Sequence, residues 1–280
     1  MSLDFSDAGI VFAHGPVLIM GVLNVTPDSF SDGGRFDSTA AACAQAQAML
    51  AAGADLIDIG GESTRPGASP VSADEEMNRV IPVIEALMRE TSPVISIDTS
   101  KAEVMQAAVA AGAAMINDVW ALRQTGALAA AAALDVPVCL MHMQGSPDTM
   151  QRDPRYACVV NEVHAFLQTR IQLCEQAGIA RERLLVDPGF GFGKRLDDNL
   201  VLLRDLGRFR DWGVPVLAGL SRKSMLGEIT GHSTDQRLIG SVILAAEAAR
   251  RGASIVRVHD VEQTREALQV AAAIGDHPIL

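Results

Sequence analysis

The chain has 280 residues, of which 49% are hydrophobic and 20% are charged, and its formal net charge at pH 7 is −11. A chain of this length and composition buries a sizeable core, which excludes a disordered protein. The acidic balance argues against a general nucleic-acid binder, although a local basic cluster can still hold a small anion.

Neither a membrane protein nor a secreted protein is indicated. No apolar run reaches the roughly 18 residues of a membrane-spanning helix, and residues 1–9 show no basic patch followed by an apolar stretch. The spacing of Cys43, Cys139, Cys158 and Cys174 fits neither a zinc site nor a disulfide framework. We therefore expect a protein of the reducing cytoplasm, with no membrane and no nucleic-acid partner.

The first predicted element is a short hairpin. Apolar residues 10–12 and 17–19 flank a His-Gly-Pro turn. We expect residues 1–16 to form an N-terminal extension whose β-hairpin covers the floor of the fold.

Eight short apolar runs then alternate with longer segments of helical pattern. Buried strands of a parallel sheet have such near-continuous apolar sequences. The runs cover residues 17–25, 55–60, 93–99, 113–119, 136–142, 184–189, 214–221 and 253–260.

The segments between the runs have one apolar face at a period of 3.6 residues. This stripe is clearest from Met77 to Met88, from Val159 to Cys174 and from Leu238 to Ala249. Eight strand-helix units predict an α/β fold, the (β/α)8 or TIM barrel, as one domain over residues 1–280. A doubly wound sheet shares the alternation and is the alternative, but eight units fit the barrel without remainder.

Every predicted strand ends in polar residues, which a barrel would bring to one rim. Helix caps and turns explain any single one of them, but not all eight. In chain order they are Asn24, Asp58 with Glu62, Asp98, Asn117 with Asp118, His142, Asp187, Ser221 to Lys223, and Arg257 with His259.

Two long loops after the first two strands are rich in Gly, Ser and Arg. They cover residues 24–37 and 60–70, and the first contains Phe30 and Phe36 although aromatic residues make up only 4% of the chain. Loops of this kind over a barrel mouth are typical of mobile lids, and the two rings favour ligand contact.

The loop from Asp187 to Lys194 reads D-P-G-F-G-F-G-K and fits neither a Walker loop nor a dinucleotide fingerprint. Phe190 and Phe192 would offer flat faces beside a carboxylate, which suits a planar, nitrogen-rich heterocycle.

The last strand and the first indicate an anion site. Arg257 and His259 alternate on one strand face, and Asn24 ends the neighbouring strand of a closed barrel. Phosphate sites in this fold usually lie near strands seven and eight. A Ser-His-Asp triad is less favoured, because no nucleophile elbow accompanies the serines.

Seven segments together resemble the dihydropteroate synthases. The two signature segments are residues 24–34 and 58–67; residues 96–99, 116–119, 187–194, 219–224 and 256–260 follow in the same order as in that family. The resemblance covers essentially the whole chain and shows no departure in any motif.

This resemblance implies a transferase that joins 7,8-dihydropterin-6-ylmethyl diphosphate to 4-aminobenzoate in folate synthesis, releasing diphosphate. It also implies Mg²⁺, a homodimer, and inhibition by sulfonamides that mimic aminobenzoate.

The resemblance also implies a role for each matching residue. The pterin is assigned to Asp98, Asn117, Met141, Asp187, Phe192, Gly219 and Lys223. The diphosphate is assigned to Asn24, Thr64, Arg65, Arg257 and His259, with Asn24 as the ligand of Mg²⁺. The 4-aminobenzoate is assigned to Phe30, Thr64, Arg65, Pro66, Phe192, Lys223 and Ser224. Catalysis is assigned to Asp98, Asp32, Lys223, Arg257 and His259, with Asp98 or Asp32 stabilising a pterin cation.

Two alternatives remain. A pterin-dependent methyltransferase on a related barrel would share Asp98, Asn117 and Asp187 but would need no diphosphate site. A non-catalytic barrel that binds pterin is the second alternative.

Overall fold

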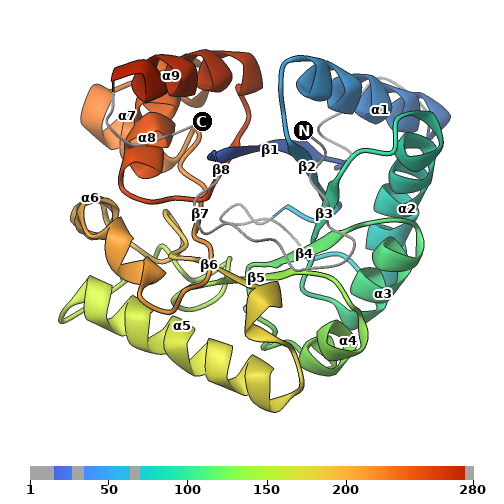
Figure 1. The fold of residues 1–280 in the computed structure, drawn as a ribbon, viewed down its shortest axis with the longest axis horizontal. Coiled ribbons are helices and arrows are strands. Elements are labelled where there is room, and N and C mark those ends of the chain that lie inside the picture. Colours follow the sequence, from blue (N-terminus) through green and yellow to red (C-terminus); the bar gives the residue numbers. More distant parts are fainter. Residues whose placement is uncertain (1–15, 27–34, 64–69, 275–280) are drawn as a thin grey trace.

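The computed structural model describes residues 16–26, 35–63 and 70–274. Within these ranges, helices surround a ring of eight parallel strands (Figure 1). The strands are β1 (Leu18–Asn24), β2 (Leu56–Gly60), β3 (Ile95–Asp98), β4 (Met115–Asp118), β5 (Val138–Met141), β6 (Leu184–Asp187), β7 (Leu217–Ala218) and β8 (Ile255–Val258).

The α-helices of the described ranges pack outside the ring; each strand is followed by one of them, except β7, which is followed by two. In the described ranges these helices are α1 (Arg35–Ala51), α2 (Ala73–Glu90), α3 (Ala102–Ala110), α4 (Ala127–Ala133), α5 (Val159–Gln176), α6 (Leu196–Arg204), α7 (Ser224–Thr230), α8 (Leu238–Arg250) and α9 (Val261–Ile274). The part of the chain that the structure describes also contains the short 3₁₀ helices η2 (Arg181–Arg183), η3 (Leu206–Arg210) and η4 (Thr234–Gln236), which lie between the α-helices. No helix of the described residues is long and apolar enough to cross a membrane.

The strand order confirms the TIM-like barrel and excludes the doubly wound sheet. Strands pair in sequence order from β1 to β6, and β1 also pairs with β8, with Leu18 opposite Ile255. A doubly wound sheet would instead reverse its order at a switch point. The barrel is nearly closed between β6 and β7, where a single parallel bridge joins Val186 to Val216. Pro215 precedes this bridge and lacks the N–H that a longer ladder would need.

The seventh unit differs from the prediction. The apolar stripe from Leu238 to Ala249 does form α8, but the short helix α7 and η4 lie between it and β7. Helix α7 spans only seven residues, too few for a helical period to be recognised in the sequence.

Only part of the predicted hairpin lies within the described residues. Its first arm, and residues 1–15 as a whole, lie outside the described residues. The apolar residues 17–19 of its second arm run into β1, which begins at Leu18.

Two apolar layers hold the barrel. The larger cluster packs the helices against the outer faces of the strands. The smaller cluster fills the barrel interior with one or two side chains from most strands: Leu18, Met20, Leu56, Met115, Cys139, Leu185, Leu217 and Ile255. Both layers exclude water, so the polar side chains above the inner cluster stand on a closed apolar floor.

Candidate active site

A cavity of about 330 Å³ lies among the strand ends. Its lining contains all seven residues predicted to bind the pterin, together with three others. The lining residues are Asp98, Asn117, Val119, Met141, Asp187, Phe190, Phe192, Gly219, Lys223 and Arg257. The structure therefore brings together residues from six strands or the loops that follow them, spread over 160 positions of the sequence.

The alternation of side chains along each strand explains this convergence. Met115, Leu185 and Ile255 belong to the apolar floor, and the residues two positions later are Asn117, Asp187 and Arg257. Because side chains on a strand repeat with a period of two, each polar group points into the barrel just above its apolar partner.

Arg257 is the centre of a buried charge network. Its Nε donates to Asp58 Oδ2 at 2.6 Å, and its terminal nitrogen Nη2 donates to Asp98 Oδ2 at 2.8 Å. Asn117 Nδ2 also donates to Asp58 Oδ2, at 3.1 Å. Arg257 thus lines the pterin cavity, whereas the sequence assigned it to the diphosphate and to catalysis but not to the pterin.

Asp58 is one of the site residues to which the sequence assigned no role. The sequence placed it among the polar residues at strand ends, and in the structure it stands two positions after Leu56 of the apolar floor. It is fully buried, and its Oδ1 has no hydrogen-bond partner among the residues that the structure describes. Its charge fixes the orientation of Arg257 and Asn117 from below the cavity.

Burial and neighbouring carboxylates set the charge of Asp98. Burial raises its pKa to about 7; Arg257 opposes this rise, and the negative charges of Asp58 and Glu76 add to it. The carboxyl group therefore changes its protonation near neutral pH, and a cation forming beside it would favour the ionised form.

Asp187 presents one oxygen to the cavity. Its Oδ1 accepts the N–H of Gly189 at 2.7 Å, while Oδ2 lies 3.9 Å from the position that a Cβ would take at Gly219. Burial raises the pKa of Asp187 to about 6. A side chain at Gly219 would extend into the cavity beside Oδ2.

The loop after Asp187 is held by Lys194, a residue for which the sequence suggested no such role. Its Nζ donates to the carbonyl oxygens of Gly189 and Phe192, at 2.8 and 3.0 Å, and lies 2.9 Å from His142 Nδ1. The backbone of Gly189 has a φ of +70°, and a Cβ there would lie 1.9 Å from the carbonyl oxygen of His142. The loop therefore packs directly on the end of β5.

Lys223 and Phe192 face each other across the cavity. The ammonium group lies 4.2 Å from the centroid of the Phe192 ring, which is a cation–π arrangement. Burial lowers the pKa of Lys223 to about 8, and the charge of Arg257 lowers it further. Phe190, by contrast, is almost fully buried, although it also belongs to the cavity lining.

The predicted anion site is less cationic than its sequence suggests. His259 follows β8, and its Nδ1 lies 3.0 Å from Ser221 Oγ. Burial lowers the pKa of His259 to about 4, with Arg257 and Arg222 adding to the effect. The ring is therefore neutral at pH 7 and offers a hydrogen bond rather than a charge.

The remaining predicted residues are distributed as follows. Asn24 ends β1 beside Gly60, whose carbonyl oxygen accepts the N–H of Val25 at 2.8 Å. Ser224 begins α7 and is exposed. Five others lie outside the described residues: Phe30, Asp32, Thr64, Arg65 and Pro66.

Comparisons with known proteins show which family this chain resembles. The family profile described as "Pterin binding enzyme" matches residues 20–259. The dihydropteroate synthase of Escherichia coli K12 is 52% identical over 269 residues, which cover 94% of this chain and 95% of that protein.

Two solved structures of Xanthomonas albilineans dihydropteroate synthase superpose closely on this chain. The one with 4-aminobenzoic acid has a TM-score of 0.88 at 56% identity and covers 94% of both chains. The one in complex with 7,8-dihydropteroate has a TM-score of 0.85 at 53% identity, covering 94% of this chain and 95% of that one.

Proposed function

The chain belongs to the pterin-binding enzyme family, and within it to the dihydropteroate synthases; from this premise we propose how its residues share the reaction. The reaction joins (7,8-dihydropterin-6-yl)methyl diphosphate to 4-aminobenzoate, giving 7,8-dihydropteroate and diphosphate. The observation that carries the proposal is the cavity whose lining contains every residue assigned to the pterin.

Diphosphate release measured with both substrates tests the reaction. The synthase requires diphosphate to appear in equal amount with dihydropteroate, and only when 4-aminobenzoate is present. The methyltransferase alternative predicts methyl transfer without diphosphate, and the non-catalytic alternative predicts pterin binding without turnover. Absence of diphosphate at high protein and Mg²⁺ concentrations would overturn the synthase.

The pterin ring is recognised by polar groups that stand on the apolar floor. Asp187 Oδ2 accepts from the amino-pyrimidine edge, and Asn117 and Asp98 match the remaining donors and acceptors. Lys223 donates to the ring carbonyl or to a ring nitrogen, while Met141 and Phe192 pack on the ring faces. A buried site of this kind rejects ligands that leave its polar groups unpaired.

Bond breaking precedes bond making in the proposed mechanism. The C–O bond to the diphosphate breaks with both electrons on the leaving oxygen, and the positive charge on the methylene carbon is shared by the pterin ring. Asp98 stabilises this cation, with Asp32 of the first loop as a second candidate. The amine of 4-aminobenzoate then attacks the methylene carbon and loses a proton, which needs no strong base because the aryl ammonium is acidic.

The diphosphate site fits a metal ion that arrives with the substrate. Among the described residues, no group of three or more His, Cys, Asp or Glu side chains could hold a metal ion. Mg²⁺ commonly takes one or two protein ligands and completes its shell with phosphate oxygens and water. Asn24 would supply the protein ligand, and a bound ion would neutralise charge on the leaving diphosphate. Arg257, a neutral His259, Thr64 and Arg65 would hold the remaining oxygens.

The 4-aminobenzoate site is assigned to the cavity mouth. Phe192 and Lys223 border it, and Ser224 follows directly with a hydroxyl group and the first backbone N–H groups of α7 for the carboxylate. Phe30, Thr64, Arg65 and Pro66 complete the assignment from the two long loops. Sulfonamides that mimic aminobenzoate would compete for the same place.

A homodimer is supported by the helices α7, α8 and α9, which lie together in Figure 1. Each of the three carries exposed apolar side chains. Ile239 and Ile243 share one face of α8 and are 74% and 60% exposed. Ile229, Val270 and Ile274 are also exposed. Light scattering of Ile243→Glu tests this: the dimer predicts a shift toward monomer, and an unchanged mass would refute this face.

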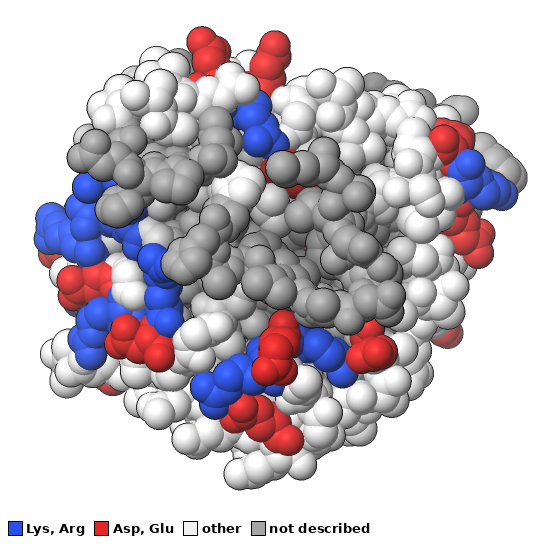
Figure 2. Space-filling view, viewed as in Figure 1, with Lys and Arg blue, Asp and Glu red and all other residues white. Residues whose placement is uncertain are grey.

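The other expectations concern the chain as a whole. We propose that residues 1–280 form one pterin-binding domain that works in the cytoplasm, where its four free thiols would stay reduced. On the face shown in Figure 2, Lys and Arg are interspersed with Asp and Glu rather than gathered into one basic surface. This distribution and the net charge of −11 give no support to a nucleic-acid partner.

A further inference from the structure

The turn that carries the Phe192 ring is closed by one buried ammonium group. Lys194 Nζ donates to the carbonyl oxygens of Gly189 and Phe192, and the N–H of Phe192 donates to the same oxygen of Gly189 at 3.1 Å. Nζ also lies 2.9 Å from Nδ1 and 3.3 Å from the carbonyl oxygen of His142, which directly follows β5. A single side chain therefore joins both ends of the turn to the neighbouring strand.

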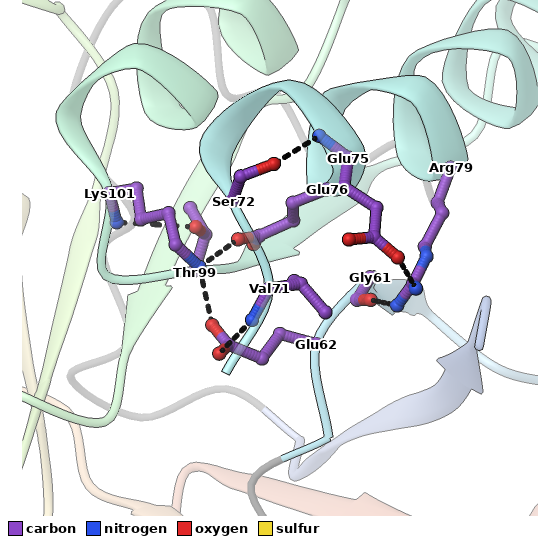
Figure 3. Close-up of polar contacts among 9 residues, drawn as sticks. All are labelled: Gly61, Glu62, Val71, Ser72, Glu75, Glu76, Arg79, Thr99 and Lys101. Atoms are coloured by element: carbon purple, nitrogen blue, oxygen red, sulfur yellow. Dashed lines mark hydrogen bonds and ion pairs between the residues drawn. The ribbon is translucent and has the colours of Figure 1, made fainter. Parts of the chain in front are cut away.

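Lys101 shows how this fold stabilises another lysine that is partly withdrawn from water (Figure 3). Its Nζ donates to one carboxylate oxygen of Glu62 and to one of Glu76, each at 2.5 Å. Lys194 is more deeply buried, with only 3% of its surface exposed, yet its hydrogen-bond partners in the described part of the chain are one imidazole nitrogen and three carbonyl oxygens. Burial lowers the pKa of His142 to about 2, so that ring carries no charge, and it lowers the pKa of Lys194 to about 7.

Satisfying the carbonyl groups of the turn does not by itself require a charged residue. Gln151 Nε2 donates to the carbonyl oxygen of Gly191 at 2.5 Å, and the hydroxyl of Tyr156 donates to that of Gly193 at 2.7 Å. Burial of an ammonium group that no carboxylate pairs costs stability. An ammonium group, however, has three donors that point in different directions, whereas an amide group has two and a hydroxyl has one. Lys194 therefore ties three points of the structure together at a cost in stability, which indicates that the position of the turn matters.

The turn borders two side chains that line the pterin cavity. The Phe192 ring belongs to an apolar cluster with Met141 and Met143, and its centroid lies 4.2 Å from Lys223 Nζ. A Cβ at Gly191 would lie 3.1 Å from Lys223 Cδ, so the main chain of the turn also packs against the stem of Lys223. A shift of the turn would therefore displace both the ring and the ammonium group that face each other across the cavity.

We propose that Lys194 is a positioning residue for the pterin diphosphate. Lys194 does not line the cavity; it fixes the turn whose Phe192 ring packs on the pterin and whose main chain supports Lys223. Displacement of groups that hold a substrate slows a reaction strongly even when it is small. This role rests on the proposed function, which assigns Phe192 and Lys223 to the pterin.

The test compares the kinetics of Lys194→Met and Phe192→Ala. Lys194→Met keeps an apolar stem but removes the donors, so kcat/KM for the pterin diphosphate should fall about tenfold, and the KM values for the two substrates should change in the same pattern as in Phe192→Ala. Arg183→Met is the matched control. Arg183 also donates to main-chain carbonyl oxygens, including that of Val136 at 2.8 Å, but beside the residues where β5 and β6 begin. Its loss should lower Tm and leave both KM values unchanged.

A double-mutant cycle separates positioning from a general loss of structure. If Lys194 acts through the ring, Lys194→Met should change kcat/KM less than about twofold in a Phe192→Ala background, while it still lowers Tm. An unchanged kcat/KM in Lys194→Met, fully additive losses in the cycle, or an equal kinetic loss in Arg183→Met would overturn the proposal.

Lys194→Gln is a milder variant, because it keeps two of the three donors on a shorter side chain. It should show a kinetic loss between those of the parent and Lys194→Met. Failure of both Lys194 variants to fold would also overturn the proposal, since the role of the residue would then be structural. Absence of diphosphate release by the unmodified enzyme would instead refute the proposed function, so the two failures are distinguishable.

Discussion

Replacing Arg257 by methionine tests the buried charge network at the centre of the cavity. Methionine keeps an apolar stem of similar length but removes the guanidinium, which binds Asp58 at 2.6 Å and Asp98 at 2.8 Å. Both carboxylates lie in the interior, with Asp58 fully buried. Removal of one partner from a buried ion pair costs about 3–5 kcal/mol. For a domain of this size, that corresponds to a fall in Tm of roughly 6–20 °C.

The loss should also depend on pH. The pKa of Asp98 is about 7 in the folded protein and about 3.9 in an unfolded chain. Because the folded value is raised, the stability that Asp98 contributes is present at low pH and is lost as pH rises toward 7. Without Arg257 the pKa rises further, so the decline continues above pH 7. The difference between variant and parent should grow by up to about 1 kcal/mol from pH 7 to pH 8, because the parent itself still loses about 0.4 kcal/mol over that interval.

Thermal unfolding at pH 6, 7 and 8 measures both effects. Arg250→Met is the control, because Arg250 is an exposed residue of α8 and pairs only with Glu247 at the surface; it should change Tm little at any pH. A fall of less than about 2 °C for Arg257→Met, or a fall that does not grow with pH, would refute the reasoning. In binding assays the same variant should lose more affinity for the pterin diphosphate than for free pterin.

Four further predictions concern single residues of the site. Asp187→Ala should abolish pterin binding in calorimetry, because it removes the acceptor that faces the cavity; unchanged affinity would contradict the pocket assignment. Arg65→Ala should raise KM for 4-aminobenzoate and spare pterin affinity, and an unchanged KM would remove Arg65 from that role. Gly189→Ala should lower Tm at least twice as much as Gly178→Ala, because both have positive φ but a Cβ at Gly178 meets nothing within 4 Å. The pKa of Lys223 is about 8, so kcat/KM for the pterin diphosphate should fall above pH 8 as the ammonium loses its charge. A profile that stays flat to pH 9.5 would show that the reaction does not need the charged form of Lys223.

Much of the fold could be predicted because the signals are local. Short apolar runs and helical stripes identified eight units, and the count of eight indicated a closed barrel rather than an open sheet. The two failures have physical causes. Helix α7 is too short to show a period, and Pro215 limits the ladder that would otherwise extend β7. The hairpin expected in residues 1–16 stays a prediction, since its first arm lies outside the described residues.

The part of the candidate site that lies at strand ends was predictable from the sequence. Polar residues such as Asn117 and Asp187 were identified because each ends a short apolar run, and the structure adds that each stands two positions after an interior apolar residue. Lys194 and Lys101 were missed, because a lysine after a loop gives no sign of whether it will be buried. Their roles become visible only when the loops are packed on neighbouring strands.

The sequence by itself therefore determined the barrel, its polar rim and the family of reactions, since these depend on periodicity and on short motifs. Only the tertiary structure decided which charges meet. Arg257 and Asp58 are 199 positions apart and come into contact because the barrel closes. Burial then decides protonation: His259, read as a cation from its sequence, is neutral, and Asp98 titrates near pH 7. Contact and desolvation are properties of the packed molecule, so no local pattern of residues reports them.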